Sequence, residues 1–146
     1  MFLRKLTIIH AALVITLLIF GAITYSFGVG FVTNFDTKSD TFIYIVPIIA
    51  LLGYFGSIYI FKKQIRNISS SEELQLKLAK YQTASIIKYA VIEGPTLLIF
   101  FEFMNSGYTL YFTIACCLLL YLAVQRPNKN RLIQELNLNT EEQRKL

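Results

Sequence analysis

Four long apolar runs alternate with short polar segments along this chain, and this alternation predicts helices that cross a membrane. The runs cover residues 6–31, 42–61, 83–104 and 108–124. A helix rises about 1.5 Å per residue, so runs of roughly 20 residues match a hydrocarbon core about 30 Å thick, and the last run is short for this. We therefore expect an all-α, polytopic membrane protein, with four transmembrane helices in a single domain that spans residues 1–146.

The polar segments between these runs predict turns and short helices. In the connector, residues 62–82, Ser70 and Glu73 have the spacing of a capping box, so the third helix is expected to start near Ser71 and to continue unbroken into the membrane. The sequence "NSG" at 105–107 predicts a tight turn. In the tail, residues 125–146, we expect one short helix after Pro127 and another after Thr140.

Positive charge lies almost entirely on one side of these predicted helices. Of the 14 Lys and Arg residues, Lys38 alone lies in the 32–41 and 105–107 loops. Because cytoplasmic loops carry the excess of Lys and Arg, both termini are expected to be cytoplasmic, in a multi-pass protein of the inner membrane. The cations flank apolar runs and are not gathered on one patch, which argues against nucleic acid as a partner.

Composition supports this class and excludes others. The chain is 55% hydrophobic and 16% charged, too apolar for a soluble domain of 146 residues. The "MFLRK" start resembles a signal peptide, but the long run behind it lacks a small-residue cleavage site, so we expect a retained helix. Cys116 and Cys117 are adjacent in an apolar run, which predicts packing residues and neither a disulfide nor a metal site. No cofactor-binding motif or catalytic set appears, so we expect no cofactor and no enzyme activity.

Ionisable residues inside the predicted spans are the candidate chemistry. Glu102 lies within a turn of the outer interface, and Lys88 can extend its stem to the inner headgroups. Glu93 lies near the middle of its span and reaches neither surface, so we expect it to be neutral. Tyr89 and Thr96 are the best-placed partners on its own helix, and His10 is the other buried candidate.

Two interpretations of Glu93 stay open from the sequence. It is either a structural, hydrogen-bonded carboxyl or a proton- or ion-handling group, with His10 and Lys88 as further candidates for that role. Pro95 removes the hydrogen bond to the Val91 carbonyl, and Gly94 tolerates the strain, so a helix kink with a free carbonyl is predicted beside Glu93.

Two other patterns suggest contacts. Gly53 and Gly56 offer small surfaces for close helix packing, either inside one bundle or between subunits. Lys77 and Lys80 flank an amphipathic stretch before the third span, which predicts either contact with anionic lipid headgroups or a solvated helical extension.

Two families are similar to this chain. The run "IIKYAVIEGPTLLIF", the one-turn gap, the last span and the tail "RPNKNRLIQELNLNTEE" resemble small, uncharacterised four-helix inner-membrane proteins of bacteria of the Bacteroidetes type. That resemblance implies no activity. Residues 42–104 share the layout of the proteolipid (c) subunit of rotary ATPases, in which Glu93 would be the ion-carrying carboxylate. The long connector, the two extra helices and the lack of a glycine repeat depart from that family.

These observations lead to two functional hypotheses. The first is a non-enzymatic integral membrane protein, an accessory subunit that binds another membrane protein or a second copy of itself. The alternative is an oligomeric proton or cation conductor that uses Glu93.

Overall fold

The computed structural model of the chain describes residues 1–34 and 40–146 and places six helices in them. Lys38 lies outside the described residues. The only strand-like feature in the described part is an isolated parallel bridge between Val32 and Tyr108. The helices are α1 (Phe2–Phe27), α2 (Phe42–Arg66), α3 (Leu74–Ser106), α4 (Thr109–Val124), α5 (Lys129–Leu136) and α6 (Thr140–Arg144).

The predicted all-α class is confirmed, and the long helices are those of a multi-pass membrane protein. α1, α2 and α3 each have the length and hydropathy needed to cross a bilayer. α4 has 16 residues and meets that test only together with α5, from which it is bent by 81°. Three helices are therefore long and apolar enough to cross a membrane, and the fourth crossing stays a prediction.

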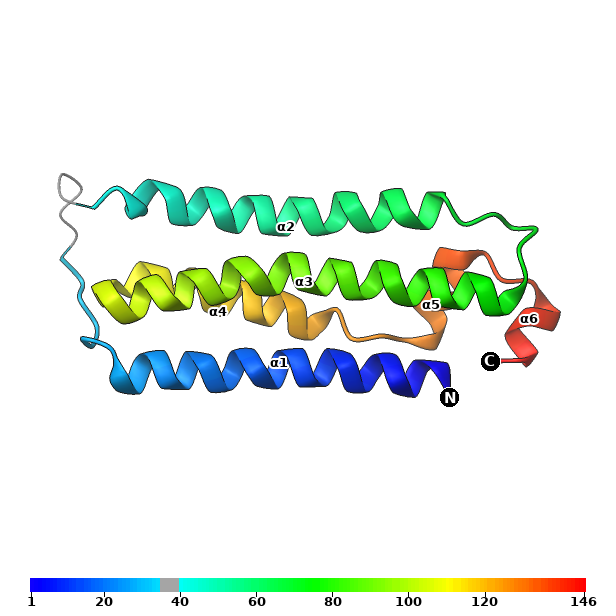
Figure 1. Cartoon of the computed structure of the whole chain (residues 1–146), viewed down its shortest axis with the longest axis horizontal. Coiled ribbons are helices and arrows are strands. Elements are labelled where there is room, and N and C mark those ends of the chain that lie inside the picture. Colours follow the sequence, from blue (N-terminus) through cyan, green and yellow to red (C-terminus); the bar gives the residue numbers. More distant parts are fainter. Residues whose placement is uncertain (35–39) are drawn as a thin grey trace.

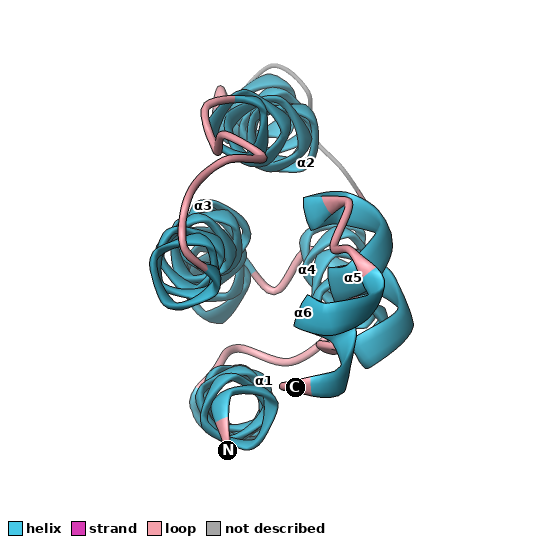
Figure 2. Ribbon diagram, turned by 90° about the vertical axis from the view of Figure 1, so that its right-hand side faces the viewer, coloured by secondary structure: helices cyan, strands magenta, loops and turns pink. Residues whose placement is uncertain are grey.

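α3 lies at the centre of the bundle. Figure 1 shows α1 to α4 side by side, successive helices running in opposite directions, with both chain ends at the same end of the bundle as the α2–α3 loop. Viewed from that end, α3 lies between α1 and α2, and α4 lies beside it (Figure 2). α1, α2 and α4 each make their most extensive contacts with α3. Its 33 residues correspond to about 50 Å, so it is far longer than the hydrocarbon core.

The surface of the bundle is apolar, as a bilayer requires. Large hydrophobic side chains on α1 and α2 are widely exposed, including Ile8 at 60%, Leu52 at 67% and Phe55 at 62%. In water such a surface would cost free energy in proportion to its area, whereas lipid tails solvate it. The buried interior is also apolar, so both faces of the helices match a lipid environment.

Two helix boundaries differ from the prediction. α1 ends at Phe27, before the end of the predicted 6–31 span, because Gly28 adopts an extended conformation. The apolar residues beyond it are used differently: the Phe31 ring packs 5.6 Å from Phe103 and 5.4 Å from Phe112. The hydrophobic pattern thus continues beyond the end of α1, because the residues that follow α1 pack back onto the bundle.

The predicted start of the third helix was also wrong. α3 begins at Leu74, and its N-cap Glu73 makes no side-chain capping bond, so the Ser70–Glu73 capping box is not formed. Instead Glu72 accepts a hydrogen bond from the Ser69 amide at 3.2 Å and an ion-paired hydrogen bond from Lys80 at 2.7 Å. A capping box forms in α6, where Asn139 and Glu142 cap each other's backbone amides. The other expectations hold, because α3 is continuous and two short helices follow Pro127 and Asn139.

The turn at the end of the bundle opposite the termini is fixed by hydrogen bonds between two loops. Gly107 ends α3 with φ of 72°, a left-handed conformation that favours glycine. Its carbonyl accepts a hydrogen bond from the Val32 amide at 2.7 Å, and the Val32 carbonyl accepts one from the Thr109 amide at 3.2 Å. Asp40 accepts from the Tyr111 hydroxyl at 2.8 Å and from the Phe42 amide at 2.9 Å. These bonds tie the α1–α2 loop to the α3–α4 turn.

α2 and α3 pack closely where the glycines of α2 meet Pro95. A Cβ atom built on Gly53 would lie 2.9 Å from Cγ of Pro95, whereas one on Gly56 would lie 3.7 Å from Cγ1 of Val91. The first position has no room for a methyl group and the second has normal contact distance. Both glycines therefore pack inside this bundle.

This difference gives a matched test of the α2–α3 packing. Gly53→Ala should be less stable than Gly56→Ala by about 1–3 kcal/mol, because the added methyl would push the helices apart. The gain in helix propensity is the same for both changes and cancels in the comparison. Reversible unfolding in detergent would measure it, and equal stabilities would contradict the close packing.

Candidate functional site

Glu93 is half-buried on α3 and has no partner in the described part of the chain. No hydrogen bond or ion pair to its carboxyl is formed by any described residue. Tyr89 and Thr96, the partners considered from the sequence, bond elsewhere: the Tyr89 hydroxyl donates to the Gln125 carbonyl at 3.3 Å, and the Thr96 hydroxyl to the Ile92 carbonyl at 2.7 Å. The Val91 carbonyl, which Pro95 leaves without its helical donor, lies against α2, 3.3 Å from the Cβ position of Gly53.

Most other polar side chains in the apolar helices are satisfied locally. Hydroxyls donate to carbonyls of their own helix, as Thr24 does to Gly21 at 2.9 Å and Ser57 to Tyr54 at 2.7 Å. Glu102 also forms no side-chain bond to a described residue, but it lies one turn from the end of α3, where water is within reach. Glu93 is therefore the carboxyl group whose position at mid-helix calls for a partner from outside the chain.

The surface beside Glu93 is open and formed by small residues. Ala90 and Gly94 are exposed and lie four residues apart, and a Cβ atom on Gly94 would have no described atom within 4 Å. Leu98, 52% exposed, continues the same face one turn on. Figure 2 shows no helix of the described chain on the side of α3 opposite α4. We call Ala90, Gly94 and Leu98 the open α3 strip.

Small residues four apart let another helix approach closely in a membrane. The sequence contains this signal in the spacing of Ala90 and Gly94, but the pattern does not reveal that they face outward. The glycines singled out from the sequence, Gly53 and Gly56, face the bundle interior instead.

His10, Lys88 and Glu93 are not brought together as a relay. His10 Nε2 lies 2.8 Å from the Leu122 carbonyl, and its ring stacks edge-on against Tyr89 at 5.0 Å. The ammonium of Lys88 donates to Gln125 Oε1 at 2.6 Å and lies 4.5 Å above the Phe61 ring. In this chain both cationic candidates are thus engaged with α4 and its C-terminal end.

The first turns of α3, residues 74–82, project beyond the predicted span, and we call them the α3 foot. The tail packs on this foot through two polar contacts. Lys77 is 2% exposed and its ammonium lies 2.8 Å from Oε1 of Glu142. The Tyr81 hydroxyl donates to Oε2 of Glu135 at 2.7 Å.

Lys77 thus has a protein partner in place of the lipid headgroup expected from the sequence. Lys80 is 41% exposed at its side chain and pairs with Glu72. The predicted lipid contact through these two lysines would have to compete with both ion pairs. Distant acidic partners such as Glu142 had no sequence signal, because 65 residues separate the pair.

The ion pair makes docking of the tail dependent on pH. The hydrogen bond from Lys77, helped by the Asn139 amide, lowers the pKa of Glu142 below its usual range. A lowered folded-state pKa means that this group's contribution to stability is fully present above the unfolded value, about 4.3. That contribution is lost as pH falls through the lowered folded pKa.

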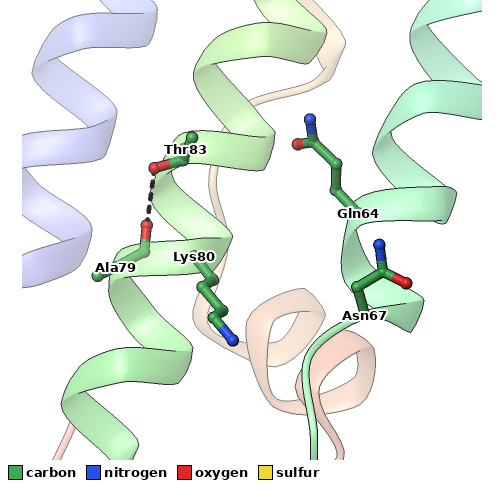
Figure 3. Close-up of a pocket in the computed structure, with 5 residues that line it drawn as sticks. All are labelled: Gln64, Asn67, Ala79, Lys80 and Thr83. Carbon is green, nitrogen blue, oxygen red and sulfur yellow. Dashed lines mark hydrogen bonds between the residues drawn. The ribbon is translucent and has the colours of Figure 1, made fainter.

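A cleft of about 340 Å³ lies between the C-terminal end of α2 and the part of α3 where the α3 foot ends. Figure 3 shows Gln64 and Asn67 on one side and Ala79, Lys80 and Thr83 on the other. Oε1 of Gln64 is buried without a hydrogen-bond partner in the described residues. Lys80, the cation of this cleft, is already paired with Glu72, so the cleft has little attraction for an anion.

Comparison with known proteins adds no relative: no protein-family model, curated protein or solved structure matches the chain. The two family resemblances of the sequence therefore stay predictions.

The tail contacts generate a stability prediction. Glu142→Gln should lower the melting temperature more than Lys77→Met, because it leaves a buried ammonium without a counter-charge, whereas the second change removes that charge. Thermal unfolding of the detergent-solubilised protein at pH 7 would measure both.

Glu141→Gln is the matched control, since Glu141 is exposed and forms no bond to a described residue. The advantage of the wild type over Lys77→Met should shrink as the pH falls through the lowered pKa of Glu142. An effect of Glu141→Gln equal to that of Glu142→Gln would contradict the specific pairing of Lys77.

Proposed function

We propose that this chain is a non-enzymatic integral protein of the bacterial inner membrane that serves as an accessory subunit of a larger membrane complex. The observation that supports this most is the unpartnered carboxyl of Glu93 beside the open α3 strip. A mid-membrane carboxyl is costly unless it is hydrogen-bonded, and small residues beside it allow a partner helix to come close enough. A transmembrane helix of another protein would supply both the missing bond and the missing packing.

We further propose four crossings with both termini in the cytoplasm. The one-sided distribution of Lys and Arg supports this orientation. The position of both chain ends at one end of the bundle is compatible with an even number of crossings (Figure 1). α4 alone corresponds to about 24 Å, so the bilayer would have to be locally thin, or the residues flanking α4 would have to complete the crossing.

Cysteine labelling tests this topology. In a variant without Cys116 and Cys117, cysteines at Asn105, Ser70 and Thr140, three exposed positions, report on the two membrane sides. A membrane-impermeant maleimide should label Asn105→Cys in intact cells, and Ser70→Cys and Thr140→Cys only after permeabilisation. Labelling of Thr140→Cys from outside would mean three crossings and would refute the fourth.

The open α3 strip makes a prediction about the partner. A photo-crosslinking residue at Leu98 should join the chain to one distinct membrane protein, and the same residue at Leu52, exposed on α2, should not. Gly94→Leu should reduce that product by roughly tenfold, because the side chain blocks the approach of a helix. It should leave the isolated chain as stable as before, since nothing lies within 4 Å of its Cβ position.

A second function uses the same carboxyl. A group without a partner in its own chain is also what a carrier of protons or cations needs, so copies of this chain could form a conductor through Glu93. His10 and Lys88 are bonded to Leu122 and Gln125, so a relay through them would require that these contacts open.

Glu93→Gln separates the two functions. Glutamine keeps the shape and hydrogen bonding of a neutral carboxyl but does not titrate. If the chain is an accessory subunit, Glu93→Gln should leave the crosslink from Leu98 undiminished. Neither the wild type nor the variant should then conduct protons in liposomes. The conductor predicts flux from the wild type that Glu93→Gln abolishes, with crosslinks between identical chains.

A further inference from the structure

A second cleft, at the same end of the bundle as the chain termini, has a different character from that in Figure 3. It encloses about 380 Å³ between α2, Tyr121 of α4 and Glu135 of α5, and we call it the α2–α5 cleft. Its lining combines cationic side chains with apolar ones, and we call the latter the apolar wall: Ile58, Phe61, Ile65 and Tyr121. This combination suits an anionic amphiphile better than a small ion or a soluble metabolite.

Three cations line the α2–α5 cleft. Lys62 and Arg66 lie one helical turn apart on α2, and neither side chain bonds to a described residue. Lys88 enters from α3 and uses one of its three N–H donors on Gln125, which leaves two for a ligand. Together they provide a guanidinium fork and two ammonium groups, the donors that recognise phosphate oxygens.

One carboxylate, that of Glu135, opposes these cations. Oε2 of Glu135 accepts the hydrogen bond from Tyr81, so this group is held in place by the α3 foot. Three positive charges and one negative charge leave a net charge of two in the cleft. The cleft in Figure 3 has no such excess, because Lys80 there is neutralised by Glu72.

The apolar wall gives the site a direction. Ile58 lies one turn before Lys62 on α2 and Tyr121 one turn before Gln125 on α4, both toward the middle of their helices, whereas the Phe61 ring lies 4.5 Å from the ammonium of Lys88. Lys62 and Arg66 follow directly after the second apolar run, at the level where headgroups meet the hydrocarbon core. A phosphate at the cations would thus extend an acyl chain along Ile58 and Tyr121.

We propose that the α2–α5 cleft binds one anionic membrane phospholipid, with its phosphate diester at Lys62, Arg66 and Lys88 and an acyl chain on the apolar wall. The lysines of the α3 foot, for which the sequence suggested a lipid contact, are paired within the chain. The proposed site instead uses cations with N–H donors available to a lipid. The inference depends on α2 crossing the membrane and is independent of the accessory role proposed for Glu93.

Lipid titration with a matched charge control tests this. The purified protein in a neutral detergent is titrated with phosphatidylglycerol, and bound lipid is counted by native mass spectrometry. Lys62→Gln with Arg66→Gln should weaken binding by about fivefold for each cation removed. Arg4→Gln with Lys5→Gln removes the same charge from exposed α1 residues at the same end of the bundle, and should leave the affinity of the first bound lipid unchanged.

Further probes identify the chemistry of the ligand. Phosphatidylcholine should bind at least tenfold more weakly, because its headgroup carries no net charge. Inorganic phosphate at the same concentration should not displace the lipid if the apolar wall contributes. Displacement by phosphate alone would indicate an anion site and overturn the lipid assignment.

Equal losses from the two double variants would show general surface attraction and would also overturn the site. Displacement of the lipid by an acidic peptide, but not by excess phosphatidylcholine, would assign the cleft to a protein partner instead. Both double variants change exposed side chains that form no bond to a described residue, so their melting temperatures without lipid should match that of the wild type.

Discussion

The length of α3 relative to the bilayer is the constraint on which the rest of this structure depends. A helix of 33 residues exceeds a hydrocarbon core of about 30 Å by several turns, so part of it must lie outside. The membrane part provides the surface on which α1, α2 and α4 pack. The part that projects beyond the core, the α3 foot, is amphipathic and would be unstable alone, since isolated short helices are marginal in water. The tail returns to cover it, which explains why Lys77 is buried and paired with Glu142.

Within the membrane part, the need to satisfy polar groups decides how side chains are used. Hydroxyls such as that of Thr24 bond to their own helix, whereas Tyr89 and His10 bond to backbone carbonyls at the C-terminal end of α4. These hydrogen bonds stabilise the bundle and occupy the polar groups that form them. Glu93 forms no such bond to a described residue, and it lies beside the open α3 strip, which no helix of the described residues covers. The missing bond of Glu93 and the open α3 strip beside it therefore support a partner outside this chain. They equally support a role for this carboxyl in carrying protons or cations.

At the end of the bundle that holds the chain termini, the positive charges fall into two sets that the structure uses differently. Lys77 and Lys80 are neutralised by Glu142 and Glu72, and they hold the tail and the α2–α3 loop in place. Lys62 and Arg66 form no ion pair with a described residue and line a cleft with an apolar wall. Net charge alone does not distinguish the two sets. The fold distinguishes them, because an ion pair needs contact within about 4 Å, and Glu142 and Glu72 lie that close to Lys77 and Lys80.

The sequence by itself determined the class of this protein and most of its helices. Long apolar runs bounded by charges predict membrane helices without knowledge of packing, because the bilayer imposes their length. The ends of helices were less predictable, since Gly28 stops α1 within an apolar run and α3 begins at Leu74 without the predicted Ser70–Glu73 capping box. Glu93 was recognisable as unusual from its position alone. Only the tertiary structure decided that Tyr89 and Thr96 bond elsewhere, that Gly53 and Gly56 face inward while Ala90 and Gly94 face outward, and that Lys77 is buried. These outcomes depend on which faces of different helices meet, and contacts between residues far apart in the chain leave no periodic signal in a single sequence.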